Sequence, residues 1–90
     1  MLKIGLEKRA QKFLAELPPK HTRQTREKLF KLAEDPYPPD SKQLKGSSYR
    51  GTDIGEYRII YTVEKNAVRI YLIGKRNDDD VYRRLKRLAD

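Results

Sequence analysis

The stretch GEYRIIYTVEKNAVRIYLIGK (55–75) constrains the fold most, because its apolar residues recur at every second position. Successive side chains of a β-strand point to opposite faces, so this alternation predicts strands that bury one face. One alternating run covers residues 57–63, a second covers 68–73, and the polar pair Lys65-Asn66 separates them. Two β-rich runs with a short polar break between them are typical of a hairpin. The sequence therefore predicts a β-hairpin over these two runs.

The same alternation assigns the side chains of the hairpin to two faces. Tyr57, Ile59 and Tyr61 share one face, which we expect to pack against the core. Arg58 belongs to the opposite face and should therefore point out of the core. In the second run, one face should carry Val68, Ile70 and Leu72. The other face should carry Arg69, Tyr71 and Ile73.

Helical spacing replaces the alternation in the first half of the chain. Apolar residues recur three and four positions apart at Leu6, Ala10, Phe13, Leu14 and Leu17. This spacing predicts an amphipathic helix with one apolar stripe. Pro18-Pro19 ends it, because a proline disfavours helical backbone in the residue before it. A second helix is expected over about 20–34, and the short connection makes the two helices antiparallel neighbours.

Shorter elements fill the rest of the chain. Residues 2–6 are expected to form an edge strand. The proline-rich segment 35–41 is expected to be an ordered loop, because proline fits neither a helix interior nor a central strand. A short strand is expected at 44–49, followed by a glycine-containing turn at 51–55. Apolar spacing near the C-terminus predicts a short helix over about 79–88.

These elements follow the order β-α-α-β-β-β-α, which predicts an α+β fold. The expected architecture is one antiparallel sheet with the N-terminal helical hairpin on one face and a short C-terminal helix. The opposite face of the sheet is then left for solvent, a partner or a site. A chain of 90 residues fits one domain, so a single domain is expected over residues 1–90.

Composition excludes several classes of site. The chain has no cysteine, which rules out disulfides, cysteine-ligated zinc and thiol nucleophiles. Its one histidine, His21, is too few for a histidine-rich metal centre or a nuclease that uses a histidine pair. No apolar run reaches the roughly 20 residues that cross a bilayer, and the early charges of the N-terminus do not fit a signal peptide. A soluble, cytoplasmic protein with no membrane partner is therefore expected.

Net charge indicates the kind of partner. Lysine and arginine number 21 against 13 acidic residues, which gives a formal net charge of +8. Cationic side chains release condensed counterions when they bind nucleic acid, so phosphate-bearing partners are favoured. An acidic protein partner fits the same charge.

The run Asp78-Asp79-Asp80 fits either a magnesium site or the start of a helix. Hard cations bind carboxylate oxygens, but consecutive residues at a helix start point in different directions and rarely meet at one ion. Asn77 or Asp78 can instead accept hydrogen bonds from first-turn amides, with the other carboxylates near the positive end of the helix dipole. The helix-cap interpretation is preferred, so neither a metal nor another cofactor is expected.

A tyrosine and the cations around this run define a candidate RNA site. Arg76 lies just past the predicted hairpin, Tyr82 lies in the first turn of the expected C-terminal helix, and Arg58 lies on the neighbouring strand. Arginine binds phosphate with two hydrogen bonds and aromatic rings stack on bases, so this set suits RNA. Three further cations can join the same basic surface: Arg50, Lys45 and Lys75. The alternative is a solvated strand face on which Arg58 pairs with Glu56 or Glu64.

The segments LKG (44–46) and IGEYRIIYTVEKNAVRIYLIGKRNDDDVYRRL (54–85) resemble the RelE family of toxins from type II toxin–antitoxin systems, within the RelE/ParE superfamily. The helical segment AQKFLAELP (10–18) agrees with this resemblance. It implies a ribosome-dependent endoribonuclease that cuts mRNA in the ribosomal A site without a metal. It also implies that Arg58 and Arg76 lie at the scissile phosphate and that Tyr82 stacks on or orients the substrate.

The chain departs from the family pattern at the residues that handle protons. Many relatives have a basic residue where this chain has Asp53, and the lysines proposed as general base in some relatives have no clean match. Arg50 is the nearest cation, and charge stabilisation suits it better than proton abstraction because a guanidinium is a poor base.

The resemblance implies three partners: a cognate antitoxin protein, the ribosome and mRNA. It implies no small-molecule cofactor. Two other kinds of protein would have the same fold and basic surface. One is a ParE-like toxin that binds DNA gyrase, and the other is a catalytically degenerate member that only binds its antitoxin.

Overall fold

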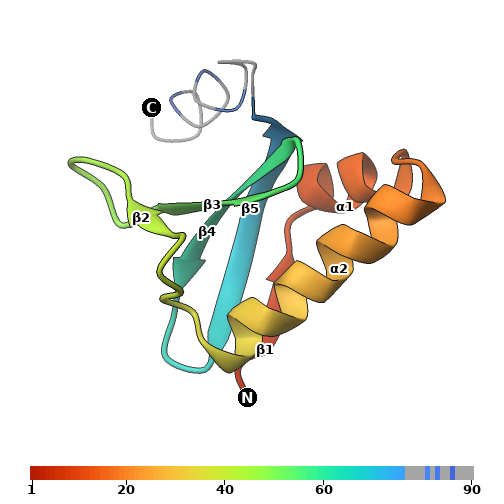
Figure 1. Ribbon diagram of the computed structural model, residues 1–90. Helices are drawn as coiled ribbons and strands as arrows, with labels where there is room; N and C mark the ends of the chain where they lie inside the picture. The colour runs from red at the N-terminus through yellow and green to blue at the C-terminus, as the bar shows by residue number, and fades with distance from the viewer. Residues whose placement is uncertain (77–80, 82, 84–85, 87–90) are drawn as a thin grey trace.

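Two helices and five strands make up the described part of the chain, which covers residues 1–76, 81, 83 and 86 of the computed structural model (Figure 1). In chain order they are β1 (Lys3–Leu6), α1 (Lys8–Ala15), α2 (Pro19–Glu34), β2 (Lys42–Gln43), β3 (Arg50–Ile54), β4 (Tyr57–Val63) and β5 (Ala67–Lys75). The strands form one sheet in the order β1-β5-β4-β3-β2. The α+β class and the N-terminal helical hairpin are confirmed. The helix expected over 79–88 falls largely outside the described residues.

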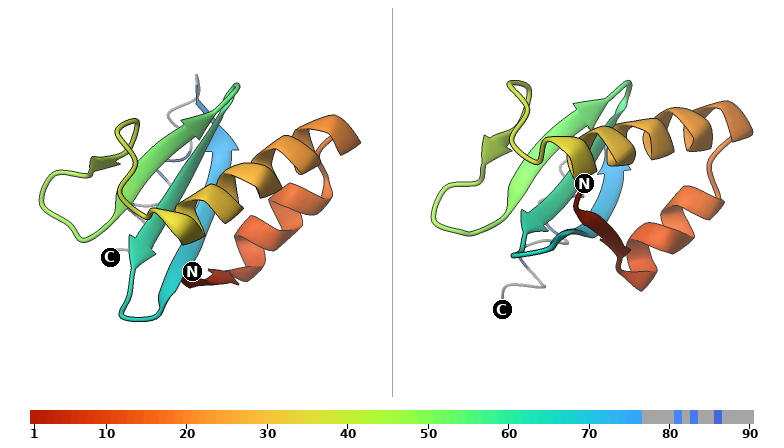
Figure 2. Two further views of the ribbon diagram at one scale, coloured as in Figure 1. Left: turned by 60° about the horizontal axis from the view of Figure 1, so that its bottom comes forward. Right: turned by 90° about the horizontal axis from the view of Figure 1, so that it is seen from below.

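Both helices lie on one face of the sheet, where the apolar spacing predicts them (Figure 2). Ala10 and Leu14 of α1 are four residues apart and are both buried. Pro19 is the first residue of α2, a position at which the amide hydrogen that proline lacks has no helical partner anyway. Thr22 Oγ1 lies 3.1 Å from the carbonyl oxygen of Leu14 and 3.3 Å from that of Leu17. This hydroxyl therefore satisfies carbonyls at the end of α1 and fixes the turn between the helices.

β1 is the strand that departs from the expected antiparallel sheet. It lies at one edge next to β5 and runs parallel to it, with Lys3 opposite Ala67 and Leu6 opposite Ile70. Parallel strands need a long crossover connection, and the chain between these two strands supplies one. The other three strand pairs are antiparallel, as expected.

The prediction of a strand at 44–49 and a turn at 51–55 is wrong. The short strand β2 comes earlier, and the next strand, β3, occupies most of the segment expected as a turn. A turn lies between them instead, with Gly46 at φ 76° and a 3.1 Å hydrogen bond from the Ser47 amide to the Leu44 carbonyl. β3 contains a glycine and an aspartate, which have low strand preference, yet every residue of it pairs with β4. Tertiary pairing outweighs local preference here.

A β-bulge between Ile60 and Tyr61 changes the side-chain pattern of β5. Ile60 lies opposite Leu72, whereas Tyr61 lies opposite Ile70. Tyr71 is therefore the extra residue, and the alternation of β5 is reset after it. The prediction that Leu72 shares a face with Ile70 is wrong for this reason. The alternation predicted for β4 is confirmed, because β4 contains no extra residue.

Each face of the sheet carries a core. The main core lies between the sheet and the helices and contains Ala10, Leu14, Leu29, Leu32, Tyr57, Ile59, Tyr61, Val68, Ile70 and Ile73. A smaller core lies on the face away from the helices, which we call the outer face. It contains Ile60, Leu72 and Val81, with Leu44, Tyr49 and Tyr71 packed around them. The expectation of an uncovered outer face is therefore wrong at its centre, and a candidate site must lie beside this smaller core.

Candidate functional site

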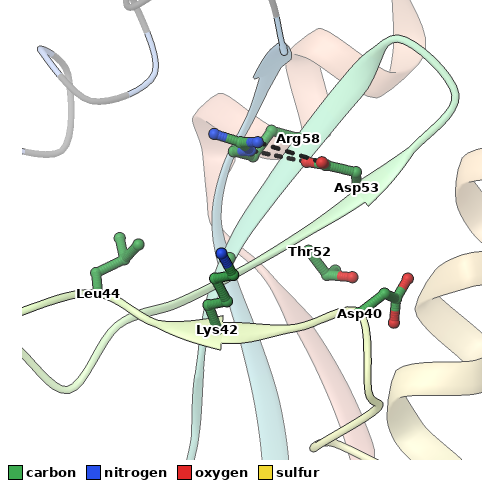
Figure 3. A pocket seen from close by; sticks show the side chains of 7 residues that line it. Asp40, Lys42, Leu44, Thr52, Asp53 and Arg58 are labelled. Carbon is green, nitrogen blue, oxygen red and sulfur yellow. Dashed lines mark hydrogen bonds and ion pairs between the residues drawn. The ribbon is translucent and has the colours of Figure 1, made fainter.

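Arg58 is the residue around which the candidate site is built. Its neighbours in β4, Tyr57 and Ile59, are buried in the main core, so strand alternation places Arg58 on the outer face as predicted. Asp53 of β3 lies directly opposite it in the register. Arg58 Nε donates a hydrogen bond to Asp53 Oδ1 at 2.7 Å, and Nη2 donates one to Oδ2 at 3.2 Å (Figure 3). The carboxylate therefore occupies one edge of the guanidinium with two hydrogen bonds.

The alternative interpretation paired Arg58 with Glu56 or Glu64, whereas the structure pairs it with Asp53. Directly opposite residues on antiparallel strands have Cβ atoms about 5 Å apart, which favours Asp53. Glu56 lies in the β3–β4 turn, with its Oε1 3.8 Å from His21 Nδ1. Glu64 Oε1 lies 3.5 Å from Nε of Arg69.

A pocket of about 250 Å³ opens beside the Asp53–Arg58 pair. It is lined by Asp40, Lys42, Leu44, Gly51, Thr52, Asp53 and Arg58. Lys42 of β2 lies opposite Gly51, which is two residues before Asp53, so the ammonium of Lys42 belongs to the same face as Arg58. Figure 3 shows both cations bordering the pocket. The cavity is thus lined by two cationic residues, Lys42 and Arg58, and two acidic residues, Asp40 and Asp53.

An ion pair fixes the chain just before β2. Lys28 Nζ of α2 lies 2.5 Å from Asp40 Oδ2. This hydrogen bond is the main reason that the pKa of Asp40 is lowered from its usual value. Next to it, Ser41 Oγ accepts a 2.7 Å hydrogen bond from Arg50 Nη2. Together these contacts hold the start of β2 and therefore the position of Lys42.

Arg76 and Lys75 lie at the end of β5, as predicted. The Arg76 amide donates a 2.7 Å hydrogen bond to the Glu56 carbonyl, so the chain keeps pairing with the β3–β4 turn just beyond the strand. Both cationic side chains are exposed. Gly74 lies opposite Arg58 in the register, and continued alternation places Arg76 on the same face as Gly74. Arg58 and Arg76 therefore lie on the same face at one end of the sheet.

Arg50 and Lys45 are not brought to this end of the sheet. Arg50 lies opposite Tyr61, which places it on the helix side. Its guanidinium carbon lies 4.9 Å from the centroid of the Tyr37 ring, a cation–π contact with the proline-rich loop. Lys45 is exposed in the β2–β3 turn, at the opposite end of β3 from Asp53 (Figure 1). Neither residue belongs to the pocket.

Two features expected at the site fall outside the described residues. These are Tyr82 and the acidic run 78–80 with its helix-cap or metal interpretation. Within the part of the chain that the structure describes, no three histidine or acidic side chains gather in a way that could hold a metal ion. No helix in this same part is long and apolar enough to span a bilayer.

A second group of polar side chains supports the start of β4 from the helix side. The Tyr57 hydroxyl lies 2.6 Å from His21 Nδ1 of α2, and Glu56 is adjacent. Burial, followed by the charge and hydrogen bonding of Glu56, raises the pKa of Tyr57 above its usual value. This contact fixes the backbone from which Arg58 emerges on the other face.

Among the pocket residues that sequence reasoning missed are Asp53 and Lys42. Asp53 stood out only as an acidic residue where relatives are basic, and its contact with Arg58 depends on the β3–β4 register. Lys42 gave no signal, because the strand in this region was expected at 44–49 and not at β2. A two-residue strand has no periodicity to detect.

Comparisons with known proteins agree with this architecture. The family model described as the ParE toxin of type II toxin-antitoxin system, parDE, matches residues 5–80. The isolated E. coli RelE toxin is similar at 26% identity, covering 98% of this chain and 99% of that chain, with a TM-score of 0.75. The archaeal RelE–RelB complex from Pyrococcus horikoshii matches at 26% identity over 83% of this chain and 94% of that chain, also with a TM-score of 0.75.

A more distant structure shows the same fold. The YoeB–YefM complex from Staphylococcus aureus matches at 22% identity over 81% of this chain and 94% of that chain, with a TM-score of 0.66. The comparison with curated proteins gives no match. Because the family model covers most of the sequence and the solved RelE toxins share the fold, the chain belongs to the ParE toxin family within the RelE/ParE superfamily of type II toxin–antitoxin toxins.

Proposed function

We propose that this toxin is an endoribonuclease that cleaves mRNA in the ribosomal A site and thereby inhibits translation. The observation that carries the proposal is the pocket in which Arg58 and Lys42 flank one cavity at the end of the sheet where Arg76 also lies. Clustered cations beside a cavity are what a phosphodiester needs for binding and for stabilisation of developing charge. The likeness to solved RelE toxins over almost the whole chain supports the same function.

The chemistry we propose is attack of the ribose 2′-oxygen on the adjacent phosphorus. The 2′-oxygen loses its proton to a base, the bond to the 5′-oxygen breaks, and the leaving oxygen takes up a proton. The products are a 2′,3′-cyclic phosphate and a 5′-hydroxyl. Arg58 and Arg76 would hold the phosphate and stabilise its extra negative charge, with Tyr82 orienting the base. Lys42 adds a third positive charge, and the ribosome contributes to the alignment of the mRNA.

The proposed partners are the ribosome, mRNA and a cognate antitoxin. An antitoxin is supported by the solved relatives, which include a RelE–RelB complex. The net charge of +8 fits an acidic segment of such a partner as well as it fits RNA.

A ParE-like gyrase inhibitor is the second candidate, because the matching family model is that of the ParE toxin. The two functions would have different effects on cells that express the toxin. A gyrase inhibitor causes DNA damage and filamentation, whereas an endoribonuclease arrests translation within minutes of induction. A catalytically degenerate member would do neither.

The proposal is tested by mapping cleavage of one mRNA with and without ribosomes. The wild-type chain should cut the mRNA only in the presence of ribosomes, and Arg58→Ala or Arg76→Ala should reduce cleavage at least about a hundredfold, the usual loss when one group that stabilises transition-state charge is removed. Arg23→Ala is the matched control, since Arg23 is an exposed arginine of α2 on the helix side. Full cleavage by the Arg58 variant, or filamentation in place of translation arrest, would contradict the proposal.

A further inference from the structure

Asp53 holds Arg58 in the arrangement that a phosphate would use. Carboxylates and phosphates both take two parallel hydrogen bonds from one edge of a guanidinium. In this structure the Nε and Nη2 edge already makes those two bonds, at 2.7 Å and 3.2 Å, to Asp53. A phosphate can take this edge only after the carboxylate has left it.

The sheet preforms this contact. Asp53 and Arg58 lie directly opposite each other on neighbouring strands, and the β3–β4 pairing is complete from Arg50 to Ile54. The two side chains therefore meet without any loop having to order. Their contact can also open without unfolding, because the side chains remain 34% and 25% exposed to solvent.

Asp53 is a negative charge in contact with Arg58 at the rim of the pocket. Lys42 lies on the same face, and Asp40, which also lines the pocket, is paired with Lys28. Loss of the Asp53 charge would affect RNA binding in two ways. It would make the whole pocket more positive, and it would release one edge of Arg58. Only the second effect requires Arg58 to be present.

We propose that Asp53 is an internal competitor that occupies the phosphate-binding edge of Arg58 and sets the affinity of the pocket for the phosphodiester of single-stranded RNA. Each RNA that binds must displace the carboxylate, so the free toxin engages RNA weakly until positioning by a larger assembly favours the exchange. This inference rests on the proposed role of Arg58 in binding phosphate. The candidate site would then contain one residue that weakens RNA binding, Asp53, beside the cations that strengthen it.

The test is the affinity for a fluorescein-labelled 2′-O-methyl oligoribonucleotide, measured by fluorescence anisotropy at one fixed, low salt concentration. The methyl groups block attack by the 2′-oxygen, so binding is measured without cleavage. Asp53→Asn should bind the oligonucleotide about tenfold more tightly than wild type, the size of one charge-assisted hydrogen bond. Glu27→Gln is the matched control, since it removes an equal charge at an exposed position of α2 that does not line the pocket. It should change the affinity by less than about threefold.

The decisive measurement repeats Asp53→Asn in an Arg58→Ala background. The gain should shrink to less than about threefold, because the released edge no longer exists and only the general effect of charge is left. An equal gain with and without Arg58 overturns the proposal, as does an Asp53→Asn variant that is folded by circular dichroism but binds no more tightly than wild type. Failure of the wild-type chain to cleave mRNA on ribosomes would end the endoribonuclease proposal and leave this coupling intact. Cleavage without the coupling would end this inference alone.

Discussion

Tyr57 connects the candidate site to the helices. Its ring meets the rings of Phe13 and His21 edge-on, with centroids 5.9 Å and 5.4 Å apart, and its hydroxyl lies 2.6 Å from His21 Nδ1. Arg58 is the next residue in the chain, so whatever fixes Tyr57 also fixes the point at which Arg58 leaves the sheet. Sequence alternation predicts the direction of Arg58 because it depends only on strand geometry. The Asp53 contact depends on register, which the sequence alone does not determine.

Replacement of Tyr57 by phenylalanine tests this connection. Tyr57→Phe keeps the ring and removes the hydrogen bond to His21, so the free energy of unfolding should fall by about 1 kcal/mol. The measurement is urea denaturation followed by circular dichroism. Tyr37→Phe is the control, since Tyr37 is 58% exposed and should change the stability by less than about 0.5 kcal/mol. Equal stability of the Tyr57 variant and wild type would refute the role of the hydroxyl.

The raised pKa of Tyr57 predicts a pH dependence of stability. The phenol ionises in the unfolded chain near pH 10.0 and only at higher pH in the folded protein. Between these two values the folded state binds more protons, so the free energy of unfolding falls as pH rises past about 10. Below that range the contribution of Tyr57 is constant. The loss is measured by denaturing wild type and Tyr57→Phe on both sides of pH 10. If the free energy of unfolding changes with pH in the same way for both proteins, the prediction is contradicted.

At the level of elements, β5 carries both a predictable and an unpredictable part. Its pairing with β4 follows from alternation and a polar break, signals that are local in the sequence. Its bulge at Tyr71 leaves no such signal, because one extra residue looks like an ordinary β-rich run. β2 and β3 were missed for a related reason. The strand character of β3 comes from pairing with β4, and that of β2 from pairing with β3, and not from their own residues.

Gly74 of β5 leaves room for a side chain of the smaller core, because it has no Cβ atom. A Cβ atom built on Gly74 would lie only 2.2 Å from Val81 Cγ2, a buried side chain of that core. Gly74→Ala must therefore displace Val81, and overpacking of this kind costs about 1–3 kcal/mol of unfolding free energy. Thermal or urea denaturation measures the loss. Gly5→Ala in β1 is the matched control, because a Cβ there meets nothing within 4 Å. Similar stabilities of the two alanine variants would show that the smaller core has no fixed packing.

At the scale of the whole molecule, β1 forms one edge of the sheet and holds the N-terminus in place. The amide of Leu2 donates to the Ala33 carbonyl at 2.9 Å, and the amide of Lys3 donates to the Asn66 carbonyl at 2.9 Å. β1 therefore links the end of α2 to the β4–β5 turn as well as covering one edge of β5. The sequence predicts an edge strand here, but its neighbour and direction follow from the path of the entire chain.

Removal of residues 1–6 should expose β5 as an unprotected edge. Val68 and Ile70 of β5 are fully buried in the intact protein, and an uncovered apolar edge strand pairs readily with other copies. The truncated chain should therefore form dimers or larger species in size-exclusion chromatography with light scattering. Removal of Met1 alone is the control, because Met1 is 87% exposed and lies before β1. A monomeric truncated chain with the wild-type circular dichroism spectrum would rule this out.

The parallel pairing of β1 with β5 also determines the order in which the protein can fold. Residues 3–6 pair with residues 67–70, so this pairing requires contacts of very long sequence separation. Such contacts form late and slow the folding of small domains, whereas the helical hairpin and the β4–β5 hairpin are local and can form early. During synthesis β1 leaves the ribosome before β5 and must wait for it. The pairing of β1 with β5 is thus completed only after β5 has been made.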